Sequence, residues 1–208
     1  MARRNLRNID QRILHRIIAE GAAKGIEGIS TKKIASLLRI SEPTIYIHFQ
    51  TKENLLKEAY QSALETLFLS ADFSSSEDLD VLIPRVFVSL GQQAQVHPDE
   101  ARYVFAYSHR PGSEESETKT NPAVDAIVHA FRTGWNQGGC DEGNALIDPS
   151  IDRLLDSYTF EMILAFVDSI AKKNGPTDEV TAVFYGSLLL SSIQNGKGLF
   201  EKWSRKSQ

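Results

Sequence analysis

Two short helical patterns joined by a tight turn are the feature that most constrains the fold of this chain. They lie near the N-terminus in the segment TKKIASLLRISEPTIYIHF, residues Thr31–Phe49. The second pattern begins at Ser41, whose hydroxyl can cap a helix, and Pro43 is tolerated in its first turn. Such a pair is typical of a helix-turn-helix, in which the second helix enters the major groove of DNA. The segment therefore predicts a DNA-reading domain.

Apolar residues recur at helical spacing along the rest of the chain. No segment alternates convincingly with the period of two that a half-buried strand shows. We therefore expect an all-α fold. The expected helices lie at about 8–24, 31–38, 41–49, 51–69, 80–96, 99–109, 122–137, 154–170 and 177–201.

The polar stretch at 70–80, SADFSSSEDLD, is the best candidate for the end of the N-terminal region. We predict a helix-turn-helix DNA-binding domain at 1–53 and a larger helical domain at 54–208. The helix at about 51–69 connects them, and because it runs almost to the polar stretch, the two parts should be mechanically coupled.

Charge is divided unevenly between these two parts. The chain as a whole has a net charge of −4, yet residues 1–53 hold ten Lys/Arg and five Asp/Glu, a net +5. The remainder therefore carries −9. A basic N-terminal domain attached to an acidic body concentrates attraction for phosphate at one end, although such asymmetry also fits a merely solvated face.

Several classes of protein are not expected. No apolar run approaches the roughly 18 residues needed to span a membrane, and the basic N-terminus lacks the apolar region of a secretory signal. The single cysteine, Cys140, excludes an intramolecular disulfide and a multi-cysteine metal site. The sequence therefore predicts a soluble cytoplasmic protein, with no membrane partner and no metal.

The candidate DNA-binding residues lie on the two short helices and at the start of the next one. Hydroxyl, imidazole and lysine side chains there can reach phosphate oxygens, and residues at the start of the second short helix can reach base edges. Pro43 can pack against a thymine methyl group, whereas Glu42 can accept from cytosine but repels phosphate. The candidates are Thr31, Lys32, Lys33, Glu42, Pro43, Thr44, Tyr46, His48 and Lys52.

These residues also fit purely structural roles. Thr31 and Ser41 are equally suited to capping helices, and Tyr46 and His48 to partial burial. The lysines fit a solvated face. Three basic N-terminal residues fit either a disordered tail or an arm that reaches a neighbouring groove; they are Arg3, Arg4 and Arg7.

A wider set of positions shares one familiar spacing. They are Gly25, Ser30 or Thr31, Ile34-Ala35, Ser41, Thr44, Ile45, Tyr46, His48-Phe49, Lys52 and Leu55. With this spacing, Gly25–Leu56 resembles the N-terminal DNA-binding domain of the TetR family of transcriptional regulators. One departure lies in the turn between the short helices, which usually carries Gly in the family. Here Arg39 must adopt a conformation that Gly reaches more easily.

The resemblance implies a function for the whole chain. It implies a repressor that binds a roughly palindromic double-stranded DNA operator and is released by an unidentified small-molecule effector bound in the body. Apolar surroundings favour a neutral or hydrophobic effector, and no cofactor is expected. The candidate pocket residues, each of which also fits plain core packing, are Phe87, Phe105, Tyr107, Phe131, Trp135, Tyr158 and Phe166.

The last expected helix, at about 177–201, is apolar almost all round. Such a helix needs cover on two sides, and a second subunit is the simplest cover. We therefore expect a homodimer formed through the last two helices.

An enzyme is not expected, because the chain has no Gly-x-Ser-x-Gly, no phosphate-binding Gly-rich loop and no His-Glu-x-x-His. Two alternatives stay open. One is an activator without a small-molecule ligand, and the other is a helical protein-interaction module.

Overall fold

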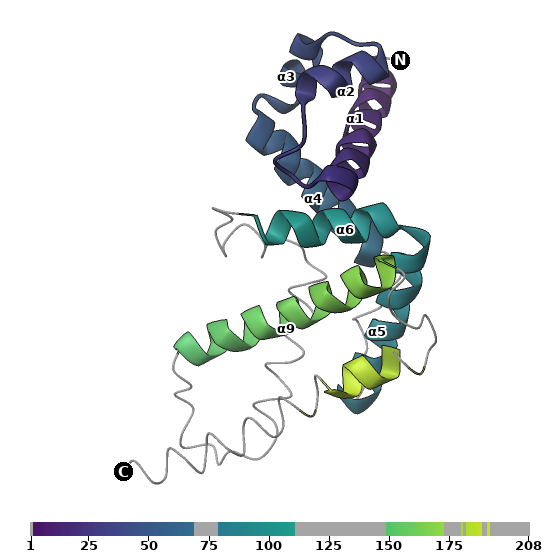
Figure 1. The fold of residues 1–208 in the computed structure, drawn as a ribbon, viewed down its shortest axis with the longest axis vertical. Coiled ribbons are helices and arrows are strands. Elements are labelled where there is room, and N and C mark those ends of the chain that lie inside the picture. The colour runs from purple at the N-terminus through teal and green to yellow at the C-terminus, as the bar shows by residue number, and fades with distance from the viewer. Residues whose placement is uncertain are drawn as a thin grey trace.

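The computed structural model describes residues 2–68, 79–110, 149–172, 180, 182–188 and 191. Every regular element in this part of the chain is a helix, which confirms the predicted all-α fold (Figure 1). The helices expected at 122–137 and over most of 177–201 lie outside the described residues. The helices are α1 (Ala2–Lys24), α2 (Thr31–Leu38), α3 (Glu42–Phe49), α4 (Lys52–Phe68), α5 (Leu79–Val96), α6 (Pro98–Ser108) and α9 (Pro149–Ala171).

Helices α1, α2 and α3 pack with the first part of α4 into the N-terminal unit. Apolar side chains from all four helices meet in its core and are almost completely shielded from water; they include Ile13, Ile17, Ile34, Ile45, Phe49 and Leu55. Their burial fixes the angle between the two short helices, which are too short to be stable alone.

Side-chain caps define where the short helices begin. Ser41 accepts a hydrogen bond from the Thr44 amide at the start of α3, and Thr51 accepts one from the Asn54 amide at the start of α4. Helix α2 is capped by Ser30, which accepts from the Lys33 amide. Thr31 is instead the first residue of α2, so its hydroxyl does not cap this helix.

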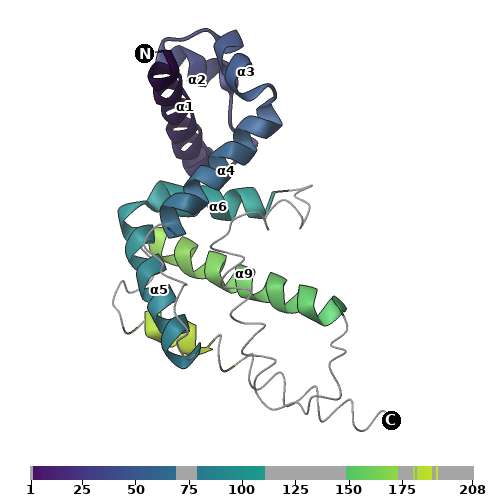
Figure 2. The same cartoon turned by 180° about the vertical axis from the view of Figure 1, so that it is seen from behind.

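Helix α4 runs out of the N-terminal unit into the body, where α6 lies crosswise between that unit and α9 (Figures 1 and 2). Helix α6 contacts α1, α4 and α9, while α5 packs on α9. The buried Tyr103 of α6 donates a hydrogen bond to the Leu56 carbonyl of α4, 3.1 Å away. Burial raises the pKa of the Tyr103 hydroxyl, which keeps it a donor.

Helix α6 also approaches α1 closely. A Cβ added at Gly21 would lie 2.5 Å from the Tyr103 ring, which is closer than carbon atoms can approach. Tyr103 therefore lies against α1 and α4 at once.

Among the described helices, none combines the length and the hydropathy required to cross a bilayer.

Candidate nucleic-acid interface

Helix α3 has one buried face and one face open to water. Ile45 and Phe49 point into the core, whereas Pro43, Tyr46 and Ile47 are exposed. Pro43 and Tyr46 are among the residues predicted from the sequence, whereas Ile47 is not, although it is the most exposed of the large apolar residues in the described part of the chain. The signal was present in the pattern, because Ile45 and Ile47 are two residues apart and cannot both face one core.

Three of the predicted residues form one hydrogen-bonded group between α2 and α3. The Thr31 hydroxyl donates to Glu42 Oε1 at 2.6 Å and lies 3.2 Å from the Tyr46 hydroxyl. Thr31 is only 7% exposed. Its hydroxyl therefore faces its neighbours within the domain, where it holds the carboxylate at the first turn of α3 in a fixed position.

The start of α3 is organised by a second hydroxyl pair. Ser41 Oγ lies 2.7 Å from Thr44 Oγ1, and Ser41 also accepts from the Thr44 amide. Thr44 is half-buried, so its hydroxyl is held at the N-terminal end of the helix that carries Pro43 and Tyr46.

His48 is held against the first helix. Its Nδ1 atom lies 2.6 Å from Asp10 Oδ1 of α1, and its side chain is largely shielded. This pairing leaves Nε2 as the ring atom with which His48 can contact a partner.

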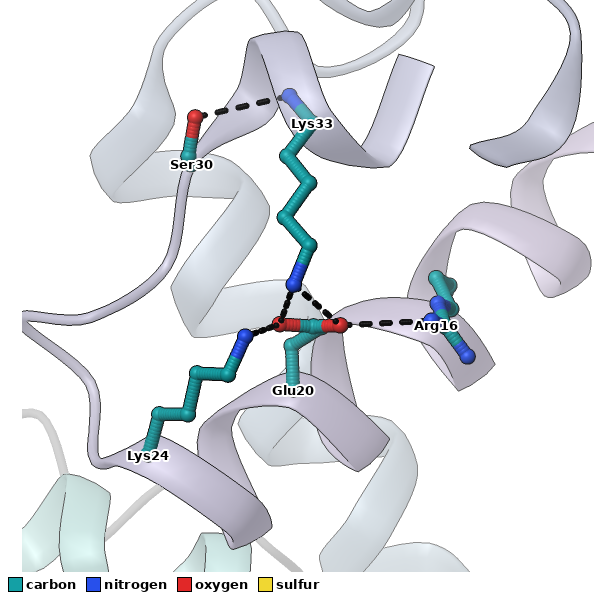
Figure 3. A network of polar contacts seen from close by, with 5 residues as sticks. All are labelled: Arg16, Glu20, Lys24, Ser30 and Lys33. Atoms are coloured by element: carbon teal, nitrogen blue, oxygen red, sulfur yellow. Dashed lines mark hydrogen bonds and ion pairs between the residues drawn. The ribbon is translucent and has the colours of Figure 1, made fainter. Parts of the chain in front are cut away.

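A cluster of three cations surrounds the carboxylate of Glu20 (Figure 3). Lys24, Lys33 and Arg16 approach its oxygens to 2.8, 3.0 and 3.2 Å respectively. Hydrogen bonds from Lys24 and Lys33 lower the pKa of Glu20 to about 2. Because three positive groups share one negative group, the cluster keeps a positive excess while fixing Lys33 of α2 to α1.

The remaining two lysines differ in how they are held. Lys52 Nζ donates to the carbonyl of Ile29 at 2.8 Å, which ties the start of α4 to the loop before α2. Lys32 is exposed on α2. The predicted residues thus lie at the start of α2, along α3 and at the start of α4, and several of them make contacts within the domain.

Two residues in the turns around α3 have left-handed backbone conformations. Arg39 has φ 57° and ψ 42°, and the Ile40 amide after it donates to the Ala35 carbonyl. Arg39 thus occupies the position of a Schellman cap that glycine usually fills, as predicted from the sequence. Gln50 has φ 64° and ψ −55°, and the Thr51 amide donates to the Phe49 carbonyl across it, which forms a strained γ-turn.

Of the candidate pocket residues whose side chains the structure describes, most pack into the core of the body. Phe87 and Phe166 are buried with ring centroids 5.0 Å apart, and Tyr107 is buried against Tyr60 at 4.6 Å. Phe105 is half-buried and stacks on His109. Phe131 and Trp135 lie outside the described residues, as does the side chain of Tyr158 in α9. The described residues contain no group of ligands suited to a metal ion.

Comparisons with known proteins agree with this geometry. Residues 13–59 match the family described as bacterial regulatory proteins, tetR family. A relative among characterised proteins is the tetracycline repressor protein class E of Escherichia coli, which is 27% identical over 105 residues. That match spans half of this chain and half of the relative.

Solved structures share the fold along most of the chain. A TetR family transcription regulator from Marinobacter aquaeolei VT8 is 21% identical, with a TM-score of 0.72 covering 92% of this chain and 98% of that one. A single-residue variant of TetR from Acinetobacter baumannii AYE, in complex with minocycline, is 16% identical, with a TM-score of 0.56 covering 89% and 96%.

Proposed function

We propose that this chain, which belongs to the TetR family of bacterial regulatory proteins, is a sequence-specific transcriptional regulator that binds double-stranded DNA. The observation that carries the proposal is the outer face of α3, which is exposed directly opposite its buried face. Helices α2 and α4, whose first turns carry Lys32, Lys33 and Lys52, both contact α3. A helix that enters the major groove needs such a face, and cations beside it can neutralise the phosphates.

The predicted residues divide into two proposed roles. Pro43, Thr44 and Tyr46 reach bases or nearby phosphates, and the three lysines with His48 contact the backbone. Thr31 and Glu42 act through position, because the hydrogen bond between them holds the first turn of α3. This division treats 1–53 as the DNA-binding domain and 54–208 as the body.

A repressor released by a small molecule is the proposed mode of regulation. The contact of α6 with α1 and α4 supports it, because a change in the body that moves α6 would also move the N-terminal unit. The relative from A. baumannii has been solved with minocycline, so the family's fold accommodates a small molecule in at least that protein. The aromatic residues Phe87, Phe105, Tyr107, Phe131, Trp135, Tyr158 and Phe166 are the proposed surroundings of such an effector.

Two substitutions test the DNA-binding proposal. A duplex enriched by the wild-type protein from a randomised pool serves as the probe, and binding is measured by fluorescence anisotropy at several salt concentrations. Lys52→Ala should weaken binding to all sequences and lower the slope of log affinity against log salt by about one. Thr44→Ala should also blur the sequence preference. Lys57→Ala, farther along the same helix, is the matched control.

The outcome separates DNA binding from protein binding. A protein-interaction module would enrich no duplex and show no steep salt dependence for DNA. If a duplex is enriched but neither Lys52→Ala nor Thr44→Ala changes its affinity, the assignment of α3 and the start of α4 to the interface is wrong.

A further inference from the structure

Ile47 lies in the middle of α3 and is 78% exposed. The helix advances about 100° per residue, so Ile47 is about 200° from both Ile45 and Phe49. These two residues are buried, and Ile47 therefore points almost directly away from the core. Packing within the described part of the domain does not account for a large apolar side chain at this position.

The neighbours of Ile47 make the exposed face partly apolar. Pro43 is exposed one turn before it, and residues four apart lie side by side on a helix. Tyr46 and Thr44 lie on the two sides of this pair, at about 100° and about 60° from Ile47 respectively. The outermost strip of α3 is thus Pro43 and Ile47, bordered by two hydroxyls.

The surroundings identify what such a strip would meet. Lys32, Lys33, Arg39 and Lys52 are all exposed on the same domain, which favours a polyanion over an apolar protein surface. The major groove of DNA offers one apolar group on its floor, the 5-methyl group of thymine. Apolar side chains contact that group, whereas the other bases are read there mainly through polar atoms.

We infer that Ile47, together with Pro43, is a specificity-determining contact for the 5-methyl group of a thymine in each half-site. The inference rests on the proposed function and narrows it to one base and one substituent. Burying a methyl group against Ile47 should raise affinity for thymine over the same base without its methyl group by about four-fold.

The test removes the methyl group and the side chain separately. The duplex enriched by the wild-type protein is resynthesised with each thymine replaced in turn by deoxyuridine, which keeps the hydrogen-bonding groups. Wild-type protein should lose about four-fold affinity at one thymine of each half-site. Ile47→Ala should bind the original duplex more weakly and show no loss at that position. Val96→Ala, which shortens a 69% exposed side chain of the body, should bind like the wild type.

Each alternative result has a distinct meaning. If Ile47→Ala still loses about four-fold on removal of the methyl group, or if wild-type protein is indifferent at every thymine, the inference is wrong while the proposed function stands. If wild-type protein enriches no duplex, the proposed function is wrong and the inference falls with it. Thermal melting of Ile47→Ala, expected to match the wild type, excludes misfolding as the cause of weaker binding.

Discussion

Arg39 holds a left-handed conformation that suits glycine better than any residue with a Cβ atom. Replacing it with glycine should raise the free energy of unfolding by about 0.5–1 kcal/mol, because the relief of strain exceeds the entropy that glycine adds to the unfolded chain. Urea denaturation measures the change. Arg39→Ala removes the same charge but keeps the strained backbone, so it should give no gain. An equal gain from alanine would assign the effect to charge.

Glu20 should make the stability of the N-terminal unit depend on pH. Its pKa lies near 2 in the folded protein, below its ordinary value of 4.5, so the carboxylate stabilises the fold above about pH 5. That contribution is lost as the pH falls through the interval between those two values. Glu20→Gln should therefore lower the free energy of unfolding by about 1–2 kcal/mol at pH 7 and by progressively less toward pH 3. The value at pH 7 allows for screening by water, because the lysine and arginine partners of Glu20 are partly exposed.

The comparison is made by urea denaturation of both proteins at several pH values. Glu27→Gln is the matched control, because Glu27 is exposed in the loop after α1. It should track the wild type throughout. If the loss of stability in Glu20→Gln stays constant from pH 7 to pH 3, it comes from the changed packing of the side chain and not from the lost negative charge.

For individual residues, the sequence predicted which side chains lie in the candidate interface better than it predicted which residues they contact. The residues at the starts of α2, α3 and α4 could be selected by type and spacing alone. That Lys33 would bind Glu20, thirteen residues away, depends on how α2 packs on α1. Thr31 turning inward depends on the same packing, since only the folded domain brings Glu42 and Tyr46 to its hydroxyl.

At the level of helices, the close contact between α1 and α6 leads to the most specific prediction. Gly21→Ala should destabilise the protein by about 1–3 kcal/mol, although alanine favours a helix, because the new methyl group would collide with the Tyr103 ring. The cost should persist in a Tyr103→Phe background, which keeps the ring. The cost should disappear in a Tyr103→Leu background, which removes the aromatic ring.

Thermal and urea denaturation of the six proteins in this double cycle give the coupling energies. The two single changes at Tyr103 also remove the hydrogen bond to Leu56, but that loss is common to both backgrounds and cancels. If Gly21→Ala costs as much beside leucine as beside tyrosine, the close approach of α1 and α6 is not the cause.

The helices themselves were predicted well where an apolar stripe marks them. Helix α1 was expected from about residue 8 and begins at Ala2, because its first turns carry no apolar stripe that periodicity could detect. Helix α9 begins at Pro149, earlier than the stripe from Leu154, since proline is accepted in a first turn. Pro84 lies inside α5, where sequence rules alone would favour a break.

For the whole molecule, α4 and α6 together link the interface to the body. Helix α4 begins at Lys52 beside the proposed phosphate contacts and ends at Phe68 in the body. Arg110, just after α6, pairs with Glu53 in the first turn of α4 and lies over the Tyr107 ring, 4.1 Å from its centroid. The body therefore contacts α4 both at the Tyr103 hydrogen bond and next to Lys52, which supports regulation through a displacement of α6.

The assembly of two chains leads to the last prediction. In the helical residues 182–188, Ala182 is buried, Gly186 packs on Pro84, and the Tyr185 ring lies 5.1 Å from Phe166. Phe184, on the opposite side of this segment, and Val180, just before it, are also apolar but exposed, at 60% and 76% respectively. This is the two-sided character that led us to expect a homodimer through the last two helices.

Phe184→Asp should therefore convert a dimer into a monomer in light scattering at micromolar concentration, because an unpaired carboxylate would be buried in the interface. Val96→Asp, at a similarly exposed apolar residue of α5, should remain dimeric. The monomer should keep its helical circular dichroism but bind a palindromic duplex far more weakly. A single chain engages one half-site and lacks the increase in affinity that comes from binding both half-sites at once. A wild-type protein that is already monomeric would contradict the dimer, and with it the palindromic operator.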